Sequence, residues 1–215
     1  MTRSTVPAMQ YQLNNYLLDG PLQPLGNQVL VKLNKVEEKT DGGLFVPTAA
    51  TEKPKEGVVV AAGPGVVHPS TGKLLPNSVS VGDTVMLTEF DGEKVDYNSE
   101  KHIFVDADDV LGSYEGGVPS AASFRPNSDR LLVKLAEAAT ETSSGIALAA
   151  TEDDDSNQGE VVAVGSGKMA ATGEIIPVEI AAGDKVLYPR NTGIETTFEG
   201  KKFKLVFADD CMAKW

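Results

Sequence analysis

The sequence predicts an all-β protein made of two similar units in tandem, each a small β-barrel that carries one long loop. Three observations predict it: an internal repeat that runs through nearly the whole chain, short runs of β-branched residues bounded by glycine, and a lack of long amphipathic helical patterns. With 215 residues, 41% of them hydrophobic, the chain has enough material for two cores.

The repeat appears when residues 24–33 are placed over residues 126–135, a shift of 102 (131 minus 29). The positions that then coincide include Gly43 with Gly145, Gly57 with Gly159, Gly63 with Gly165 and, after a deletion that makes the shift 101 (184 minus 83), Gly82 with Gly183 and Asp83 with Asp184. We therefore divide the chain into an N-terminal tail (1–22), a first unit (23–111), a linker rich in Gly, Ser, Pro and Ala (112–123) and a second unit (124–215).

Each unit contains four short segments that predict strands, because β-branched residues cluster there between turn residues. The predicted strands are 29–33, 58–62, 84–87 and 103–105 in the first unit, and 131–135, 160–164, 185–188 and 203–207 in the second. Several short strands joined by glycine turns within about ninety residues favour a small barrel.

Two glycine pairs, in Gly63-Pro64-Gly65 and Gly165-Ser166-Gly167, resemble fragments of a phosphate-binding loop. Neither is followed by a helical pattern or by a Gly-Lys-Ser/Thr ending. We therefore predict that each opens a hairpin with a polar tip, through residues 69–76 and 170–177.

Two apolar triplets, each entered by a glycine, stand inside long polar stretches between predicted strands. They are Gly43, Leu44, Phe45 and Val46 in the first unit and Gly145, Ile146, Ala147 and Leu148 in the second. Long loops without secondary structure are usually functional or disordered, and an apolar triplet gains nothing from exposure to water. We predict that the triplets are paired anchors for a partner protein.

Composition excludes several classes of function. A formal net charge of -12 argues against nucleic acid or an anionic membrane as a partner, and no stretch has the length of an apolar membrane span. The single cysteine excludes a disulfide framework and a Cys-rich zinc site. His68 and His102 have no spaced metal-ligand partners and do not recur in the second unit, and the acidic run at 152–155 lacks the spacing of a calcium loop. We therefore expect no catalytic residues, no metal and no cofactor.

Several motifs resemble the GroES or chaperonin 10 family in the same order along the chain. They are the opening Pro24 with Val29-Leu30-Val31-Lys32, the Gly-Gly-Leu-Phe-Val loop, the Gly-Val-Val-Val-Ala-Ala-Gly-Pro-Gly strand and turn, and the Val-Gly-Asp before Thr84-Val85. The resemblance covers about residues 23–215, and two joined units are similar to the tandem co-chaperonins of chloroplasts. Departures from the pattern are Ala147 within the second triplet and the four acids soon after it.

The resemblance implies a co-chaperonin that caps a chaperonin 60 barrel in its nucleotide-bound state and assists protein folding, in the chloroplast stroma. It implies mobile loops at about 34–55 and 136–158 that dock on the chaperonin's apical domains, with many weak contacts adding up through avidity. ATP and Mg would be used by the chaperonin and not by this chain. Two units per chain also imply a homo-oligomeric ring of four chains, or a mixed ring with single-unit chaperonin 10, since seven is odd.

Two other functions stay open at this stage. Zinc-dependent alcohol dehydrogenases contain a domain of the same general fold, so a GroES-like-fold oxidoreductase is one alternative, although the chain lacks a dinucleotide-binding motif and zinc ligands. A duplicated β-barrel adaptor for another protein is the other. The tail at 1–22 is compatible either with the end of a transit peptide or with a frayed terminus.

Overall fold

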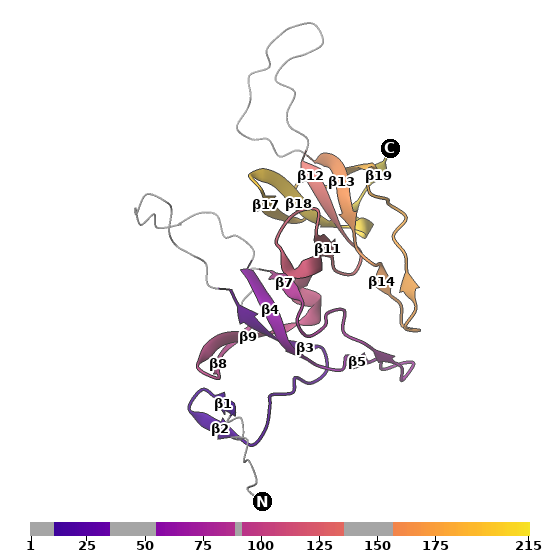
Figure 1. The fold of residues 1–215 in the computed structure, drawn as a ribbon. Helices are drawn as coiled ribbons and strands as arrows, with labels where there is room; N and C mark the ends of the chain where they lie inside the picture. The colour runs from indigo at the N-terminus through magenta and orange to yellow at the C-terminus, as the bar shows by residue number, and fades with distance from the viewer. Residues whose placement is uncertain (1–10, 35–54, 89–91, 136–156) are drawn as a thin grey trace, which may run out of the picture.

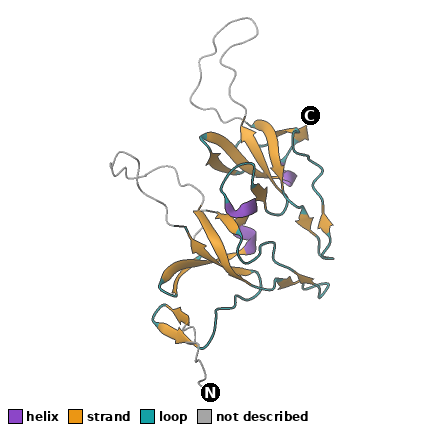
Figure 2. Cartoon of the chain, viewed as in Figure 1, coloured by secondary structure: helices purple, strands orange, loops and turns teal. Residues whose placement is uncertain are grey.

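The computed structural model describes residues 11–34, 55–88, 92–135 and 157–215 (Figure 1). Within these ranges the regular structure consists of β-strands and three short 3-10 turns, and no α-helix is present (Figure 2). The all-β prediction is confirmed. The two units lie one above the other in the view of Figure 1, with the first unit below and the second unit above.

The first unit and its flanking segments form a nine-stranded sheet with the order β11-β10-β7-β4-β3-β9-β8-β1-β2. Every pairing in it is antiparallel. Its strands are β1 (Tyr11–Leu13), β2 (Tyr16–Leu18), β3 (Gln28–Leu33), β4 (Lys55–Ala62), β7 (Thr84–Leu87), β8 (Glu93–Tyr97), β9 (Glu100–Asp106), β10 (Val110–Tyr114) and β11 (Phe124–Pro126).

The second unit forms a six-stranded antiparallel sheet with the order β17-β18-β12-β13-β16-β19. Its strands are β12 (Arg130–Leu135), β13 (Gln158–Val164), β16 (Lys185–Leu187), β17 (Ile194–Phe198), β18 (Lys201–Phe207) and β19 (Ala213–Lys214). Both strand orders are open, so the predicted closed barrels are not seen among the described residues. The eight strands predicted from sequence are all present, most of them longer than predicted by one to four residues.

The repeat found in the sequence is also a repeat of strand register. A β-bulge interrupts the first pair of long strands between Leu30 and Val31 in one unit and between Leu132 and Val133 in the other, which are equivalent positions. Bulges bend a strand and increase its twist, so a shared bulge gives both sheets the same curvature.

Gly57 and Gly159 are required by close packing beside these bulges. A Cβ atom on Gly57 would lie 2.5 Å from Cγ1 of Val31, and one on Gly159 would lie 2.5 Å from Cγ1 of Val133. No side chain fits so close to its neighbour, which explains why glycine stands at both positions.

Each predicted hairpin is present as a two-stranded ribbon outside the main sheets. β5 (Val66–Val67) pairs with β6 (Leu74–Leu75), and β14 (Lys168–Met169) pairs with β15 (Ile175–Ile176). Gly65 and Gly167 enter them with φ values of 105° and 107°, a conformation that favours glycine. Both ribbons project to the same side of the molecule (Figure 1).

Two features depart from the sequence-based division of the chain. The segment 1–22, predicted as a tail, contains the β1–β2 hairpin, which pairs with β8. The linker predicted at 112–123 begins inside β10, which runs to Tyr114 and is followed by the 3-10 turn Glu115–Gly117. Neither segment has a pronounced alternation of apolar and polar residues, so the sequence did not reveal these strands.

Buried side chains form three clusters. One lies inside the first unit and includes Val29, Val59 and Val85, and one lies inside the second and includes Leu131, Val161 and Val186. The third cluster crosses the boundary between the units, and its members are Met86, Leu111, Tyr114, Phe124, Leu132, Ala163, Phe198, Phe203 and Leu205. Burial of this shared cluster joins the units into one body.

Candidate functional site

The predicted partner anchors lie outside the described residues. This holds for all eight of them: Gly43, Leu44, Phe45, Val46, Gly145, Ile146, Ala147 and Leu148. The structure does describe the strands to which the two loops are attached, and the junction that places one unit beside the other. These parts constitute the candidate site.

The two loops start and return on equivalent antiparallel strand pairs. Leu33 of β3 faces Gly57 of β4, and Leu135 of β12 faces Gly159 of β13. At the base of the first loop the backbone N–H of Asn34 donates to the carbonyl oxygen of Glu56 at 3.0 Å. Each loop is therefore held at both ends by a rigid sheet.

The base of the first loop is linked to the junction by a side-chain hydrogen bond. The hydroxyl of Tyr114, on β10, donates to Oε1 of Glu56, on β4, at 2.7 Å. Burial raises the pKa of Tyr114 far above its ordinary value, and the hydrogen bond to the Glu56 carboxylate and its negative charge raise it further. Tyr114 is therefore a neutral donor at physiological pH.

The base of the second loop is built differently. Gln158 replaces Glu56 and Trp215 replaces Tyr114, by the shifts of the repeat. These two residues, with Lys134, Glu160 and Lys185, line a cavity of about 390 Å³. The side chain of Trp215 is 61% exposed, whereas that of Tyr114 is 4% exposed. At the first loop base, Tyr114 is buried in the junction and bonds Glu56, whereas at the second loop base Trp215 is exposed to solvent.

The junction between the units is made by strand pairing and aromatic packing. β10, the last strand of the first unit, pairs antiparallel with β11, the first strand of the second, through Gly112↔Pro126 and Tyr114↔Phe124. The ring of Phe198 lies 6.3 Å from that of Tyr114 and 5.6 Å from that of Phe124. Such aromatic contacts contribute beyond the area that they bury.

Polar side chains of the second unit fasten it to main-chain carbonyls of the first. Nδ2 of Asn127 donates to the carbonyl oxygens of Ala107 (3.0 Å) and Val110 (3.1 Å). Arg130 donates through Nη2 to the carbonyl oxygen of Asp108 at 2.9 Å, and its guanidinium lies 4.7 Å from the centroid of the Phe207 ring. Hydrogen bonds from a charged donor are stronger than neutral ones, so Arg130 is a firm anchor.

The two projecting ribbons also touch. The hydroxyl of Thr71, at the tip of the first ribbon, donates to the carbonyl oxygen of Ala171, at the tip of the second, at 2.9 Å. Between the ribbons and the junction lies a cavity of about 350 Å³, lined by Val66, Leu75 and Ile175 among others. The ribbons and the junction together fix the spacing between the two loop bases.

Strand β19 (Ala213–Lys214) and residues 22–24 correspond to the two halves of the junction, and within the described ranges they are not paired with each other. β19 pairs with β16 as β10 pairs with β7, with Lys214 opposite Val186 as Ser113 is opposite Val85. β19 is the last strand of its sheet among the described residues, and Met212 beside it is 59% exposed. Residues 22–24, the counterpart of β11, form no strand. One half of a junction is therefore present at each end.

The described residues offer no catalytic or metal-binding constellation. No group of three or more His, Cys, Asp or Glu side chains comes together in the described ranges. His102 is buried with Nδ1 at 2.9 Å from the carbonyl oxygen of Glu100, and Cys211 is half-buried with its thiol pKa raised by burial. No helix in the described part of the chain is long and apolar enough to cross a membrane.

Sequence reasoning missed Tyr114, Phe124 and Trp215 as functional residues. The repeat carried a signal for the last of them, because the shift of 101 places Trp215 directly over Tyr114. An aromatic residue that recurs at the end of both units indicates that the ends share one structural task. No comparable signal marked Tyr11, which lies outside the repeat.

Comparison with known proteins finds one family that covers both units. The family described as Chaperonin 10 Kd subunit matches residues 21–114 and again residues 123–215. Among individual proteins, the chain is 36% identical over 193 residues to the 20 kDa chaperonin, chloroplastic, of Spinacia oleracea, covering 89% of this chain and 74% of that protein.

Two further relatives agree with this assignment. The 20 kDa chaperonin, chloroplastic, of Arabidopsis thaliana is 35% identical over 196 residues, which cover 89% of this chain and 75% of that protein. The co-chaperonin GroES of Lawsonia intracellularis is 45% identical over 95 residues, 44% of this chain and 93% of that protein. The Lawsonia intracellularis relative therefore matches 44% of the chain, and each of the two plant relatives matches 89% of it.

Proposed function

The chain belongs to the chaperonin 10 family, and from that premise we propose that it is a lid that docks two loops per chain on a chaperonin 60 barrel. It is a co-chaperonin and not an enzyme, like the relatives it matches. Its compartment is the chloroplast, which both plant relatives carry in their names, and we place it in the stroma. The oxidoreductase and adaptor alternatives are not favoured, because both units match the co-chaperonin family.

One observation carries the proposal: the two units share a buried core cluster, and their loops are attached to equivalent strand pairs. The shared core cluster and the contact from Thr71 to Ala171 fix the separation of the loop bases. Two docking segments at a fixed separation bind a surface with repeated sites more tightly than one segment does, because the second contact is intramolecular.

In this proposal the docking atoms belong to the triplets 44–46 and 146–148, which enter an apolar groove on the chaperonin's apical domains. Burial of each large apolar side chain contributes about 1.5–3 kcal/mol, against which the cost of ordering the loop must be set. The individual contacts are therefore weak and reversible, which suits a lid that is released in every cycle. The chain itself needs no cofactor, and ATP and Mg serve the chaperonin.

The half-junctions at the chain ends support assembly of several chains head to tail. β19 of one chain would accept residues 22–24 of the next, as β10 accepts β11 within the chain. Closed rings of this chain contain an even number of units, and we propose four chains with eight units. Three chains plus one single-unit chaperonin 10 would give seven units, so a mixed ring is the second form proposed.

The test replaces the five large apolar residues of the triplets by serine: Leu44, Phe45, Val46, Ile146 and Leu148. We expect this variant to lose co-elution with nucleotide-loaded chaperonin 60 and to lose its effect on the chaperonin's ATP turnover. Its far-UV circular dichroism spectrum and its oligomeric state should match those of the wild type. Capping by this variant, or its unfolding, would refute the assignment of the triplets as anchors.

A matched control removes exposed apolar side chains that lie away from the loops. Val81 and Val118 are 65% and 66% exposed. Their combined replacement by serine should leave capping unchanged, since neither of them lies on a loop base. Equal loss of capping in this control would mean that general surface hydrophobicity, and not the triplets, drives the interaction.

A further inference from the structure

The aromatic pair of the junction has a counterpart in the first unit. In the second unit the rings of Phe198 and Phe203 lie 5.5 Å apart at 69°. In the first unit the equivalent residues, Tyr97 and His102, lie 5.5 Å apart at 81°. Both pairs are nearly fully buried. The first unit therefore holds an aromatic pair at the position where the second unit receives its neighbour.

In the second unit this surface is covered from two directions. Phe124, at the start of the second unit, lies against Phe198, and so does Tyr114, which belongs to the preceding unit. In the first unit the counterpart of Phe124 is Leu22, and its backbone N–H donates to the hydroxyl of Tyr97 at 3.3 Å. The residue at this position therefore contacts the pair in both units, through its ring in the second and through a backbone hydrogen bond in the first.

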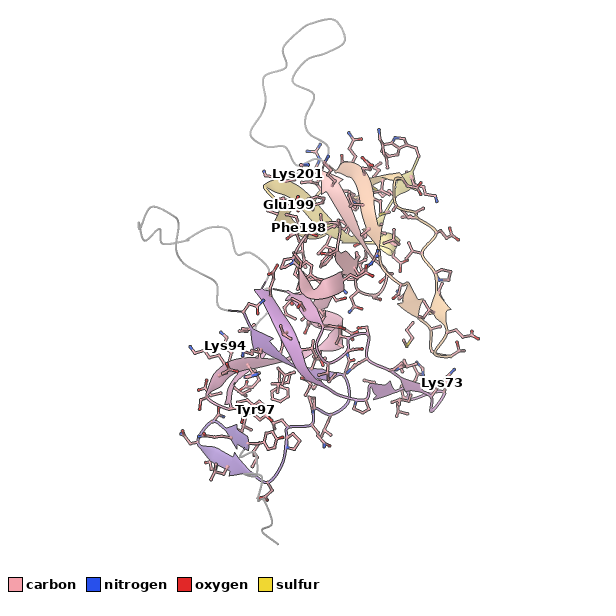
Figure 3. All side chains as sticks on the ribbon, viewed as in Figure 1. Lys73, Lys94, Tyr97, Phe198, Glu199 and Lys201 are labelled. Carbon is pink, nitrogen blue, oxygen red and sulfur yellow. The ribbon has the colours of Figure 1, made fainter. Side chains whose placement is uncertain are left out.

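The second covering contact comes from a residue outside the repeat. The ring of Tyr11, on β1, stacks on that of Tyr97 with centroids 6.3 Å apart and planes 7° apart. Tyr114 covers Phe198 at the same centroid distance, 6.3 Å, but edge-on, with planes 84° apart. Figure 3 labels the two covered residues: Tyr97 lies beside the N-terminal hairpin, and Phe198 lies beside the junction. Tyr11 thus covers the residue of the first unit that corresponds to the one covered by the preceding unit in the second.

The residue that a preceding unit would supply is Trp215 of a second copy of the chain. Trp215 is the counterpart of Tyr114, and its backbone exchanges hydrogen bonds with Lys185 (3.0 and 3.1 Å), the counterpart of the Thr84 that faces Tyr114. Its backbone is therefore held as that of Tyr114 is, yet its side chain is 61% exposed. An exposed tryptophan next to an unpaired strand edge is typical of an interface that is not yet occupied.

We propose that the N-terminal hairpin, residues 11–18, competes with Trp215 of a second copy for the aromatic surface formed by Tyr97 and His102. Head-to-tail assembly then requires the hairpin to leave or to shift, so the hairpin limits assembly at low protein concentration. This inference rests on the head-to-tail assembly in the proposed function, and adds a competitor that acts within each chain.

The attachment of the hairpin suits a displaceable segment. It joins the sheet through one residue pair, Leu13 opposite Tyr97, and through hydrogen bonds at its ends. Asn14 and Asp96 exchange two of these, from the backbone N–H of Asn14 to the carbonyl oxygen of Asp96 (2.6 Å) and from the backbone N–H of Asp96 to Oδ1 of Asn14 (3.0 Å). Gln12 and Asn98 exchange two more, from the backbone N–H of Gln12 to Oδ1 of Asn98 (3.0 Å) and from the backbone N–H of Asn98 to the carbonyl oxygen of Gln12 (2.9 Å). Its own two strands have three residues each, and a hairpin of this size is marginally stable alone.

Trp215 is the single tryptophan of the chain and reports on its own burial by fluorescence. We would follow the emission maximum during dilution of the wild type and of Tyr11→Ser, and measure mass in parallel by sedimentation velocity. We expect Tyr11→Ser to assemble at a protein concentration about three- to tenfold lower than the wild type, because one aromatic stacking contact no longer opposes assembly.

A second variant and a control keep the test specific. Asn14→Pro removes the N–H bonded to Asp96 and forbids the φ of 51° found at this residue, so it should release the hairpin and promote assembly at least as strongly. Tyr16→Ser changes the other tyrosine of the hairpin, which is 75% exposed, and should leave the assembly midpoint unchanged.

The competition also predicts dependence on Trp215. In a Trp215→Ser background, followed by sedimentation alone, Tyr11→Ser should give no further gain. Unchanged or weaker assembly of Tyr11→Ser and Asn14→Pro would overturn the competition, while the lid function, tested by capping of chaperonin 60, would be untouched. If no variant associates at any concentration, the head-to-tail ring of this chain alone falls together with this inference.

Discussion

Inside the first unit Leu87 and Ile103 belong to one apolar core, and at the equivalent positions the second unit holds Tyr188 and Lys204. Both replacements are buried. Nζ of Lys204 donates to the carbonyl oxygen of Arg190 at 3.0 Å and lies 5.8 Å from the centroid of the Tyr188 ring. The buried ammonium thus has a hydrogen-bond acceptor and an aromatic face, which compensate for its removal from water.

Outside the cores the difference in polarity is reversed, and the second unit has the more apolar side chains. The second unit presents the apolar pair Phe198 and Phe203, and the first presents the more polar pair Tyr97 and His102. The apolar pair is covered permanently by the covalently joined first unit. The polar pair is covered by the N-terminal hairpin. A surface that is always covered tolerates fully apolar side chains, and one that is covered reversibly benefits from polar groups that water can solvate.

The comparison shows which features the fold requires and which it leaves to the individual unit. The bulges, the glycines beside them and the turn before the third strand are identical, because they depend on backbone geometry. In that turn Asp83 and Asp184 each accept from a backbone N–H three residues earlier, at 2.9 and 3.1 Å. Side chains that contact each other, such as Tyr188 with Lys204 and Phe198 with Phe203, differ together from their counterparts in the first unit.

The largest expected difference between the units concerns capping. Residues 34–55 carry four Lys and four acids, and residues 136–158 carry six acids and no Lys or Arg. The second triplet also has Ala147 where the first has Phe45. We expect Leu44→Ser/Phe45→Ser/Val46→Ser to weaken binding to chaperonin 60 by more than about tenfold, since each large side chain contributes about 1.5–3 kcal/mol. Ile146→Ser/Leu148→Ser should weaken it less, and the reverse order in a co-elution titration would contradict the asymmetry.

The next largest effect is a difference in stability cost between a residue of the internal junction, Phe124, and its counterpart near the N-terminus, Leu22. Phe124 is fully buried in the shared cluster, and its counterpart Leu22 is half-buried. We expect Phe124→Ala to lower the free energy of unfolding by about 3–5 kcal/mol, the usual cost of removing a buried aromatic side chain. Leu22→Ala should cost about 1–2 kcal/mol, because less surface is lost. Urea unfolding of dilute protein measures both, and equal costs would mean that the junction is not a stabilising core.

The eight predicted strands and both ribbons follow from sequence because local rules determine them. Val29–Val31 and Leu131–Val133 are apolar runs bounded by turns, and Gly65 and Gly167 occupy positions that need positive φ. The fold class is confirmed, but the sheets of the described residues are not closed into barrels. Closure depends on pairing between distant strands, and no local pattern specifies it.

The junction and the N-terminal hairpin could not be read from sequence for related reasons. Phe124 and Tyr114 stand in a segment rich in Gly, Ser and Pro, where only tertiary contacts reveal their burial. Tyr11 has no counterpart with which to be aligned. The anchor residues remain a prediction, because they lie outside the described residues and their supporting argument comes from sequence pattern and family resemblance.

A smaller effect tests whether Tyr188 and Lys204 act as a pair. Tyr188→Leu and Lys204→Ile each introduce the residue type of the first unit into the second. Tyr188→Leu alone leaves space and removes the aromatic face from the ammonium, and we expect a cost of about 1–3 kcal/mol. Lys204→Ile alone removes the ammonium but keeps Tyr188.

The double variant should be more stable than the sum of the two single costs predicts, by about 0.5–2 kcal/mol, because it restores the combination Leu and Ile found in the first unit. A double-mutant cycle by urea unfolding gives this coupling. Additive costs would show that the two positions diverged independently. Leu17→Ser, an exposed position, serves as the reference for surface changes.

The smallest effect concerns the hydrogen bond that closes the first loop base and has no equivalent in the second. Burial is the main cause of the raised pKa of Tyr114, with the Glu56 carboxylate adding to it. In the folded protein Tyr114 stays neutral, whereas in the unfolded chain it ionises near its ordinary pKa of 10.0. Above that pH the unfolded state therefore binds fewer protons than the folded state. The stability that Tyr114 contributes is therefore present below about pH 10 and is lost as the pH rises further.

Tyr114→Phe should cost about 1 kcal/mol at pH 8, the net value of one hydrogen bond. The gap between variant and wild type should narrow from pH 9 to pH 11. Tyr188, whose pKa burial raises to about 12, titrates in both proteins and cancels from the difference. Tyr16→Phe, at an exposed tyrosine, controls for loss of a hydroxyl. A gap that stays constant across this range would mean that Tyr114 and Glu56 do not hold the loop base through a neutral hydroxyl donor.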